Sequence, residues 1–242
     1  MNEQLLKAIT RLFAIVAKER VTEDEKKKFV EFLSDHVDSD EIESYLEIFD
    51  EFSSTKSRNK SDESYQEGLI DPSTEEFIED WANIVLICKH INMELTEYQK
   101  IVMLLKIIEL ILIDGQLSER QTNLLFYISK LVKSDYKHVL AIKEFVIHSE
   151  VENLNSKNIL IIDDGSEEEY YSCRHMVLEM LSGFIAVLYL PGLETYFIKY
   201  LGINPIRLNG VPMKKRAVNV FPPGSNIRGD KVQPVFYSDI AG

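Results

Sequence analysis

The first half of the chain distributes hydrophobic and polar residues with the period of an α-helix. The opening stretch has hydrophobic residues at every third or fourth position: Leu5, Leu6, Ile9, Leu12, Phe13 and Val16. This spacing is typical of an amphipathic helix. The same pattern continues in 29–37, 42–49, 73–90, 97–113, a segment starting at Ser118, and 136–147. We therefore expect about seven helices before residue 148.

The starts of several helices are marked by capping boxes. Thr22 is followed by Glu25 and Ser118 by Gln121, and in such pairs two side chains satisfy two backbone N–H groups. Two further boxes are predicted at Ser73 and Thr96, and either Ser39 or Asp40 is expected to cap the third helix. Both the Thr22 and the Ser118 boxes follow an apolar helix and a short turn. The first half therefore resembles a duplicated helix-turn-helix bundle.

After His148 the pattern changes to short β-type runs separated by turn residues. Asn209-Gly210 is a strong hairpin signal, and Pro222-Pro223-Gly224 is a second turn. The expected strands are 159–162, 184–190, 196–200, 218–220 and 232–237, and 206–212 is expected to form a hairpin. Short strands with this punctuation favour a small sandwich or barrel. We expect an α+β protein with a helical domain at 1–150, a β domain at 151–242, and a polar surface linker at 53–67.

Charge and composition narrow the function classes. The net charge is −13, of which residues 1–147 carry −11 (18 Lys/Arg, 29 Asp/Glu) and residues 148–242 carry −2. An acidic helical half argues against nucleic-acid binding because phosphates are repelled. The longest apolar stretch, 101–113, contains Lys106 and Glu109 and is too short to span a bilayer. With two cysteines in different halves and no signal-peptide pattern at residues 1–4, we expect a reduced, cytoplasmic protein.

The motif Ile113-Asp114-Gly115-Gln116-Leu117-Ser118-Glu119 resembles the signature of TerB-like (tellurite-resistance B) helical domains. The resemblance covers residues 1–147 and implies a duplicated helical bundle. It also implies divalent metal at acidic helix positions, where Asp114 matches directly and Glu119 assists. The first repeat departs from the motif, with Lys18 and Glu19 in place of Asp-Gly.

Residues 157–242 resemble a degenerate forkhead-associated (FHA) β-sandwich. The similar segments are 208–213, which contains Asn209-Gly210, and 221–229, which ends in Ile227-Arg228-Gly229. Asn209 is the functional residue that the resemblance carries over, whereas the family's Gly-Arg and Ser-x-x-His elements are missing. The resemblance therefore implies the fold and leaves phosphopeptide binding as one alternative.

A TerB-like bundle followed by such a β domain is similar to the N-terminal region of some large bacterial ABC-type ATP-binding proteins. The resemblance implies that an ATPase cassette and membrane segments would follow in a longer polypeptide, and the abrupt end at 239–242 agrees with it. The chain itself contains no Gly-x-x-x-x-Gly-Lys-Ser/Thr phosphate loop. ATP is therefore expected only in a downstream domain.

Asp114 and Glu119 are the candidate metal ligands. Carboxylate oxygens suit Mg²⁺ or Ca²⁺, but a full site needs about six oxygens. The alternative is that Asp114-Gly115 ends a helix and Glu119 complements the dipole of the next one. The sequence favours this alternative, and we expect no other cofactor in this chain.

The only basic cluster lies in the β half. It consists of Arg207, Lys214, Lys215, Arg216, Arg228 and Lys231. Together with Asn209 these residues could bind an anion, a phosphopeptide or an acidic protein surface. The simpler interpretation is a solvated turn with ordinary lysines.

Two possible catalytic patterns are weak. The run 159–164 ends in Asp163-Asp164, like the first strand and acidic pair of a response-regulator receiver. A receiver also needs a phosphoacceptor Asp on a later strand and then a Lys, but the next aspartate is Asp230, with only 78 residues after Asp164. A turn is therefore expected at 163–165. Cys173 and His175 could form a nucleophile and base, but the acidic run 167–169 would raise the pKa of the thiol.

Taken together, the sequence predicts a non-catalytic regulatory or interaction region, the N-terminal part of a bacterial ABC transporter-type protein that couples a protein partner or signal to the ATPase. The alternatives are a metal-responsive sensor and a phosphopeptide-binding adaptor. Partner identity and oligomeric state are left open.

Overall fold

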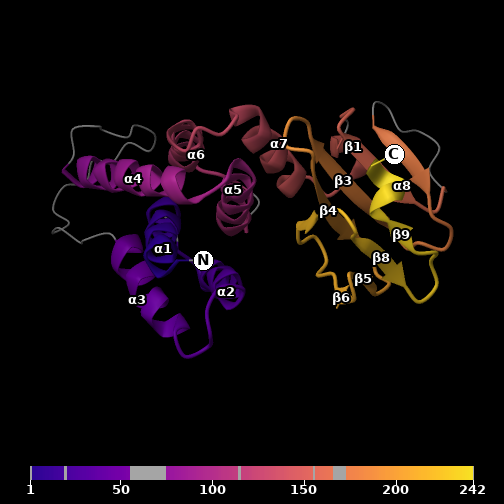
Figure 1. Cartoon of the computed structure of the whole chain (residues 1–242), viewed down its shortest axis with the longest axis horizontal. Helices are drawn as coiled ribbons and strands as arrows, with labels where there is room; N and C mark the ends of the chain where they lie inside the picture. Colours follow the sequence, from indigo (N-terminus) through magenta and orange to yellow (C-terminus); the bar gives the residue numbers. More distant parts are fainter. Residues whose placement is uncertain are drawn as a thin grey trace, which may run out of the picture. The chain divides into compact units, whose positions relative to one another are not determined.

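The computed structural model describes residues 2–18, 21–54, 75–113, 116–154, 156–165 and 173–241, with side chains from residue 80 onward in the third range. The described chain is α+β and forms two compact units, Met1–Leu140 and Ala141–Gly242. The sequence-based boundary at 150/151 lies ten residues downstream of this division at 140/141, which falls within helix α7 (Tyr136–Ile147; Figure 1).

The first unit is built from helices. They are α1 (Glu3–Ala17), α2 (Glu23–Ser34), α3 (Ile42–Ser53), α4 (Glu75–Glu94), α5 (Glu97–Ile111), α6 (Glu119–Leu131) and the start of α7 (Tyr136–Ile147). Helix α1 lies at the centre and contacts α3, α4, α5 and α6. Its residues from Leu12 to Ala17 are all buried. Since four other helices pack against it, α1 is the hydrophobic centre of this unit.

An aromatic cluster joins the first three helices. The ring of Phe13 lies 4.9 Å from that of Phe32 and 5.7 Å from that of Phe29. Phe29 in turn stacks on Phe49 at 4.6 Å. Such ring pairs add to the free energy of burial, so aromatic contacts hold α2 to α1 and α3 to α2.

Three of the predicted capping boxes are confirmed, at Thr22, Thr96 and Ser118. The fourth predicted box begins at Ser73, outside the described residues, as does most of the predicted linker. The expected cap of α3 is wrong. Helix α3 follows Glu41, which makes no side-chain cap bond, because residues 38–41 form a turn closed by the Glu41 N–H donating to Asp38 O.

The second unit contains two sheets. The five-stranded sheet has the order β2-β1-β3-β4-β7 and the four-stranded sheet the order β6-β5-β8-β9. The strands are β1 (Ile159–Asp163), β2 (Arg174–Val177), β3 (Phe184–Leu190), β4 (Thr195–Leu201), β5 (Ile206–Leu208), β6 (Val211–Pro212), β7 (Asn219–Phe221), β8 (Asn226–Gly229) and β9 (Val235–Phe236). Among the described strands, β1 and β2 are the one parallel pair. Buried residues of both sheets, such as Ile162, Ile198, Ile206 and Ile227, form one hydrophobic cluster.

The predicted hairpin is confirmed. Leu208 pairs with Val211, and the two residues between them have positive φ, +50° at Asn209 and +84° at Gly210. Two consecutive positive φ values define the turn that matches the twist of a hairpin. Asn and Gly are the residues that adopt this conformation at low cost.

Four elements of the second unit were not predicted: strands β2 and β8, a short 3-10 helix at Val151–Leu154, and a helix at Tyr237–Ala241. Strands β2 and β8 are short and mostly lack apolar alternation. The prediction of a strand over 232–237 is wrong in extent, because only Val235–Phe236 is strand and helix α8 (Tyr237–Ala241) follows. The Asp239 carboxylate, three residues on, accepts a hydrogen bond from the Phe236 N–H at 2.7 Å, as the third helical residue does in a capping box.

The five-stranded sheet is buried on both faces. All residues of β1 and nearly all of β4 are buried, and one face belongs to the shared core. On the other face the Lys199 ammonium donates to the carbonyl oxygens of Phe145 and His148 at the end of α7. The carboxyl-terminal half of α7 therefore packs against this outer face.

Candidate functional site

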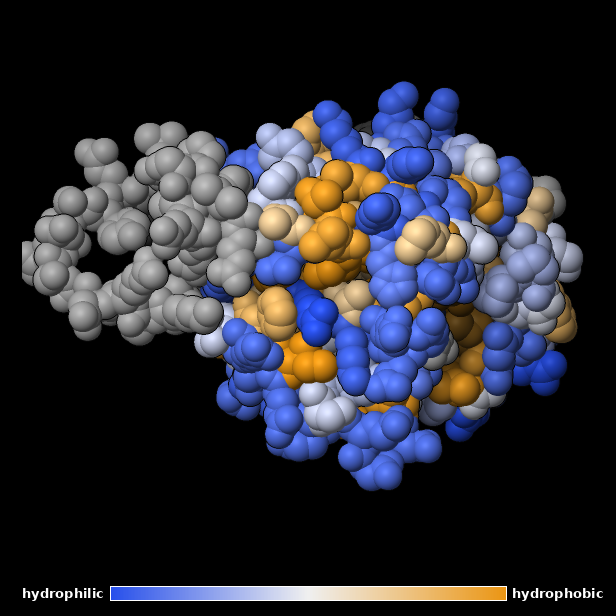
Figure 2. All heavy atoms as spheres, turned by 60° about the vertical axis from the view of Figure 1, so that its left-hand side comes forward, coloured by the Kyte–Doolittle hydropathy of each residue, from blue (hydrophilic) through white to orange (hydrophobic). Residues whose placement is uncertain are grey.

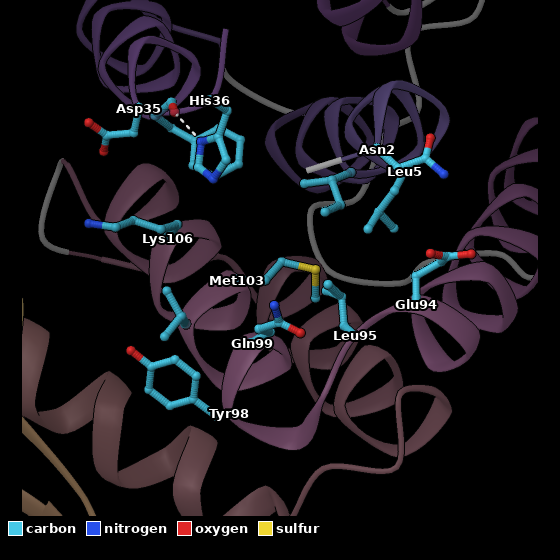
Figure 3. Close-up of a pocket in the computed structure, with 13 residues that line it drawn as sticks. Asn2, Leu5, Asp35, His36, Glu94, Leu95, Tyr98, Gln99, Met103 and Lys106 are labelled. Carbon is cyan, nitrogen blue, oxygen red and sulfur yellow. Dashed lines mark hydrogen bonds between the residues drawn. The ribbon is translucent and has the colours of Figure 1, made fainter. Parts of the chain in front are cut away.

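A groove with a volume of about 440 Å³ opens on the helical unit. It lies between the start of α1, the end of α2, and the α4–α5 junction (Figure 3). Its apolar lining consists of Leu5, Ile9, Phe32, Leu95, Tyr98, Val102 and Met103. The volume lies in the range of protein ligand sites, which are mostly apolar with a few polar groups.

Local sequence explains why these helices leave a groove. The side-chain oxygen of Asn2 caps α1 by accepting a hydrogen bond from the Gln4 N–H at 2.9 Å. Gln99 completes the capping box of α5 by accepting from the Thr96 N–H at 2.9 Å. Both caps start their helices at the groove, so neither α1 nor α5 extends across it. The opening is thus fixed by two helix ends.

The rim of the groove is acidic. Lys106 is paired with Glu109 at 2.8 Å, which compensates its charge. Asp35 and Glu94 also line the rim, and among the described residues no ion pair is found for either. Since residues 1–147 already carry a net −11, a cationic partner is electrostatically favoured here.

His36 lies at the same opening. One ring nitrogen, Nδ1, lies 2.8 Å from the Phe32 carbonyl oxygen, and the ring packs on Phe32 with 4.6 Å between centroids. Because a carbonyl only accepts, Nδ1 carries the proton in this contact. The other ring nitrogen can accept a hydrogen bond from a bound molecule when the ring is neutral.

The helical unit exposes apolar side chains outside the groove as well. On α4, Leu86 is 66% exposed and Met93 is 70% exposed. Figure 2 shows apolar patches among hydrophilic side chains on the side that it brings forward. Single exposed apolar residues are common on soluble proteins, so the groove is distinguished by its concave lining.

Of the two predicted metal ligands, the structure describes Glu119. Asp114 lies outside the described residues. Glu119 is exposed in the first turn of α6, where a carboxylate complements the helix dipole. Within the described parts of the chain, no three His, Cys, Asp or Glu side chains are close enough together to hold a metal ion. The metal site therefore stays a prediction.

Asn209 has a structural role in the β unit. Its side-chain oxygen accepts from the Asn226 N–H at 2.9 Å, and its amide nitrogen donates to Ser225 Oγ at 3.1 Å. Its own N–H donates to the Asn226 carbonyl. Asn209 thus fixes the hairpin turn to the segment that begins β8.

The structure divides the predicted basic cluster into two groups and a separate Lys231, which is exposed in the connection between β8 and β9. Arg207 and Arg228 are directly paired across β5 and β8. The exposed Lys214, Lys215 and Arg216 lie in the connection between β6 and β7. The first group shares one sheet face, and the second lies in a loop between two strands.

The structure also brings together two residues from different sequence motifs, Asp163 and His175. His175 Nε2 lies 3.0 Å from Asp163 Oδ1, and the same oxygen accepts from the Gly165 N–H at 2.7 Å. Gly165 has φ +80°, which agrees with the predicted turn. Nearby in sequence, burial raises the pKa of the Cys173 thiol. A raised pKa lowers the thiolate fraction and opposes a nucleophilic role.

The groove residues were not singled out in the sequence. Amphipathic periodicity identifies the helices, but it does not give the pairing of helix faces that leaves one opening uncovered. Comparisons with protein-family models, curated proteins and solved structures found no match. Across the described helices, none has the length and apolar character needed to cross a membrane.

Proposed function

We propose that this chain is a non-catalytic regulatory and interaction region whose helical groove binds a cationic amphipathic helix of a partner protein. The observation that carries the proposal is the combination of an apolar lining with an acidic rim in one groove of about 440 Å³. Amphipathic helices insert apolar side chains at three- and four-residue spacing into such grooves. Lysine or arginine on the flanks of the helix would face Asp35 and Glu94.

We further propose that the chain belongs to a bacterial ABC-type ATP-binding protein, in which partner binding is coupled to a downstream ATPase. The support is the resemblance of 1–147 to TerB-like domains and of 157–242 to FHA-like domains. Under this proposal ATP and any transported substrate are bound outside the chain.

The groove can be tested with a synthetic 18-residue peptide that carries leucine at helical spacing and lysine elsewhere. Its affinity for the full chain is measured by fluorescence anisotropy. Val102→Asp places a charge in the half-buried groove lining and is expected to weaken binding about tenfold. Leu86→Asp adds the same charge on exposed α4 outside the groove and serves as the matched control.

A second pair of measurements separates the groove from general electrostatics. The double variant Asp35→Asn, Glu94→Gln should weaken binding of the lysine-rich peptide. The control double variant Glu41→Gln, Glu43→Gln removes the same charge at the start of α3, away from the groove, and should weaken binding less. Equal losses in both double variants, or equal losses in Val102→Asp and Leu86→Asp, would show that the peptide does not occupy the groove and would refute the proposal.

A further inference from the structure

Two arginines lie side by side on the four-stranded sheet of the β unit. Arg207 of β5 and Arg228 of β8 are direct partners in the antiparallel register, and both are exposed. Directly paired residues project to the same face with Cβ atoms about 5 Å apart. Like charges in this position destabilise a sheet, so an anion bound between them would be stabilising.

The side chain of Arg228 is held in place by its neighbour. Arg228 Nε donates to Asn226 Oδ1 at 2.9 Å, and the Asn226 backbone is fixed by Asn209. This contact uses Nε and leaves the two terminal nitrogens of the guanidinium for another acceptor. A guanidinium held in this way loses less conformational freedom on binding.

The local charge fits a carboxylate better than a phosphate. Asp230 Oδ1 lies 3.6 Å from Arg207 Nη1, and both side chains are at least half exposed. Two arginines and one aspartate leave a net charge of +1 in this group. One carboxylate would neutralise it, whereas a phosphate monoester of charge near −2 would leave an excess of negative charge.

Apolar residues flank the arginine pair on the same face. Pro212 is paired with Arg207, and Phe236 is paired with Asn226, two residues before Arg228 in β8. The side chain of Phe236 is 46% exposed. Diagonal positions such as Arg228 and Phe236 are about 7–8 Å apart, and residues two apart in an extended peptide are separated by about 7 Å.

We propose that this face, defined by Arg207, Arg228, Asn226 and Phe236, binds an extended acidic segment of a partner protein. A Glu or Asp carboxylate of the segment bridges the two guanidiniums, and an apolar side chain two residues away packs on Phe236. A flat sheet face of this kind suits a peptide segment better than a small molecule, which needs a concave site. The site lies in the β unit and is independent of the helical groove.

The test uses the full chain labelled with ¹⁵N and the peptide acetyl-Gly-Ser-Glu-Thr-Leu-Thr-Ser-Gly-amide. Amide shifts of β5, β8 and β9 should change with peptide concentration in the millimolar range. Arg207→Gln and Arg228→Gln should each weaken binding about fivefold. Lys215→Gln removes the same charge outside the paired rows and should leave the affinity unchanged.

Three further peptides determine the chemistry. Replacing Glu by Gln should abolish the shifts, and placing Glu and Leu next to each other should weaken binding because the two-residue spacing is lost. A phosphoserine peptide that binds about tenfold more tightly than the Glu peptide would assign the face to phosphate and overturn the proposal. Absence of shifts with the Glu peptide, or an equal loss in Lys215→Gln, would also overturn it.

Discussion

Lys199 gives the sharpest test of the energetics of the β unit. Its side chain is 1% exposed, and the ammonium donates to Phe145 O and His148 O at the end of α7. Burial, followed by the nearby charge of Arg216, lowers the pKa of Lys199 from 10.5 to about 8. The carbonyls at a helix end have no partner within the helix, so this lysine closes the end of α7 at the cost of burying a charge.

The sign of the pH effect follows from the two states. Between pH 8 and pH 10.5 the unfolded chain keeps the Lys199 proton while the folded chain releases it. The free energy of unfolding therefore rises with pH in this window. For a folded pKa of about 8, the rise between pH 7 and pH 9 is about 1.4 kcal/mol, and the full shift corresponds to about 3 kcal/mol.

We expect Lys199→Met to remove this rise. The assay is urea unfolding at pH 7 and pH 9, followed by the methyl resonances of Ile185 and Ile198 in the sheet core. The difference in free energy of unfolding between wild type and variant should change by about 1.4 kcal/mol between the two pH values. Tyrosines and Cys173 also titrate at high pH, but they are common to both proteins and cancel in this difference.

Lys215→Met is the control, because Lys215 is exposed and its substitution should leave the pH dependence unchanged. If the difference between wild type and Lys199→Met is the same at pH 7 and pH 9, the buried ammonium carries no desolvation penalty. That result would refute the argument for a depressed pKa in the folded state.

Three other predictions concern single side chains. Thr96→Ala removes the cap of α5 and should cost the helical unit about 1 kcal/mol, measured by urea unfolding with the fluorescence of Trp81, whereas Thr96→Ser should be neutral; equal losses would contradict the capping role. Gly202→Ala should destabilise the β unit by more than about 3 kcal/mol, because a Cβ at this position would lie 1.9 Å from the Ser182 carbonyl oxygen. Urea unfolding followed by the methyl resonances of Ile185 and Ile198 measures the effect, and an unfolding midpoint equal to that of the wild type would contradict it. In native protein at pH 8, iodoacetamide should modify Cys173 before Cys88, as followed by peptide mapping with mass spectrometry. Cys88 is 1% exposed, and burial raises the pKa of its thiol to about 12. Modification of Cys88 before Cys173 would be inconsistent with this burial.

The helical half could be predicted well because its signals are local. Capping boxes at Thr22, Thr96 and Ser118 depend on residues three positions apart, and each is formed as expected. The helix over 136–147 has the predicted limits. The error at α3 arose because Ser39 and Asp40 have the chemistry of caps, while the turn at 38–41 placed Glu41 at the helix start.

The β half was predicted only where a strand is apolar or a turn is distinctive. Residues 184–190 form β3 with the predicted limits, and Asn209-Gly210 forms the hairpin turn. Strands β2 and β8 depend on long-range pairing partners, which a single-sequence pattern does not identify. For the same reason the sequence grouped Arg207 and Arg228 with Lys214–Arg216 by charge, while the register separates them.

The division of the chain within α7 has a consequence for the design of fragments. A β-domain fragment begun at residue 148 would lack Phe145, and one begun at residue 151 would lack both Phe145 and His148. The buried ammonium of Lys199 would then lose one or both carbonyl partners on an uncovered sheet face. Such a fragment is expected to express as an aggregating species. A fragment that begins before Ala141 would keep this covering helix, so soluble expression of the two fragments compared side by side would locate the smallest autonomous folding unit.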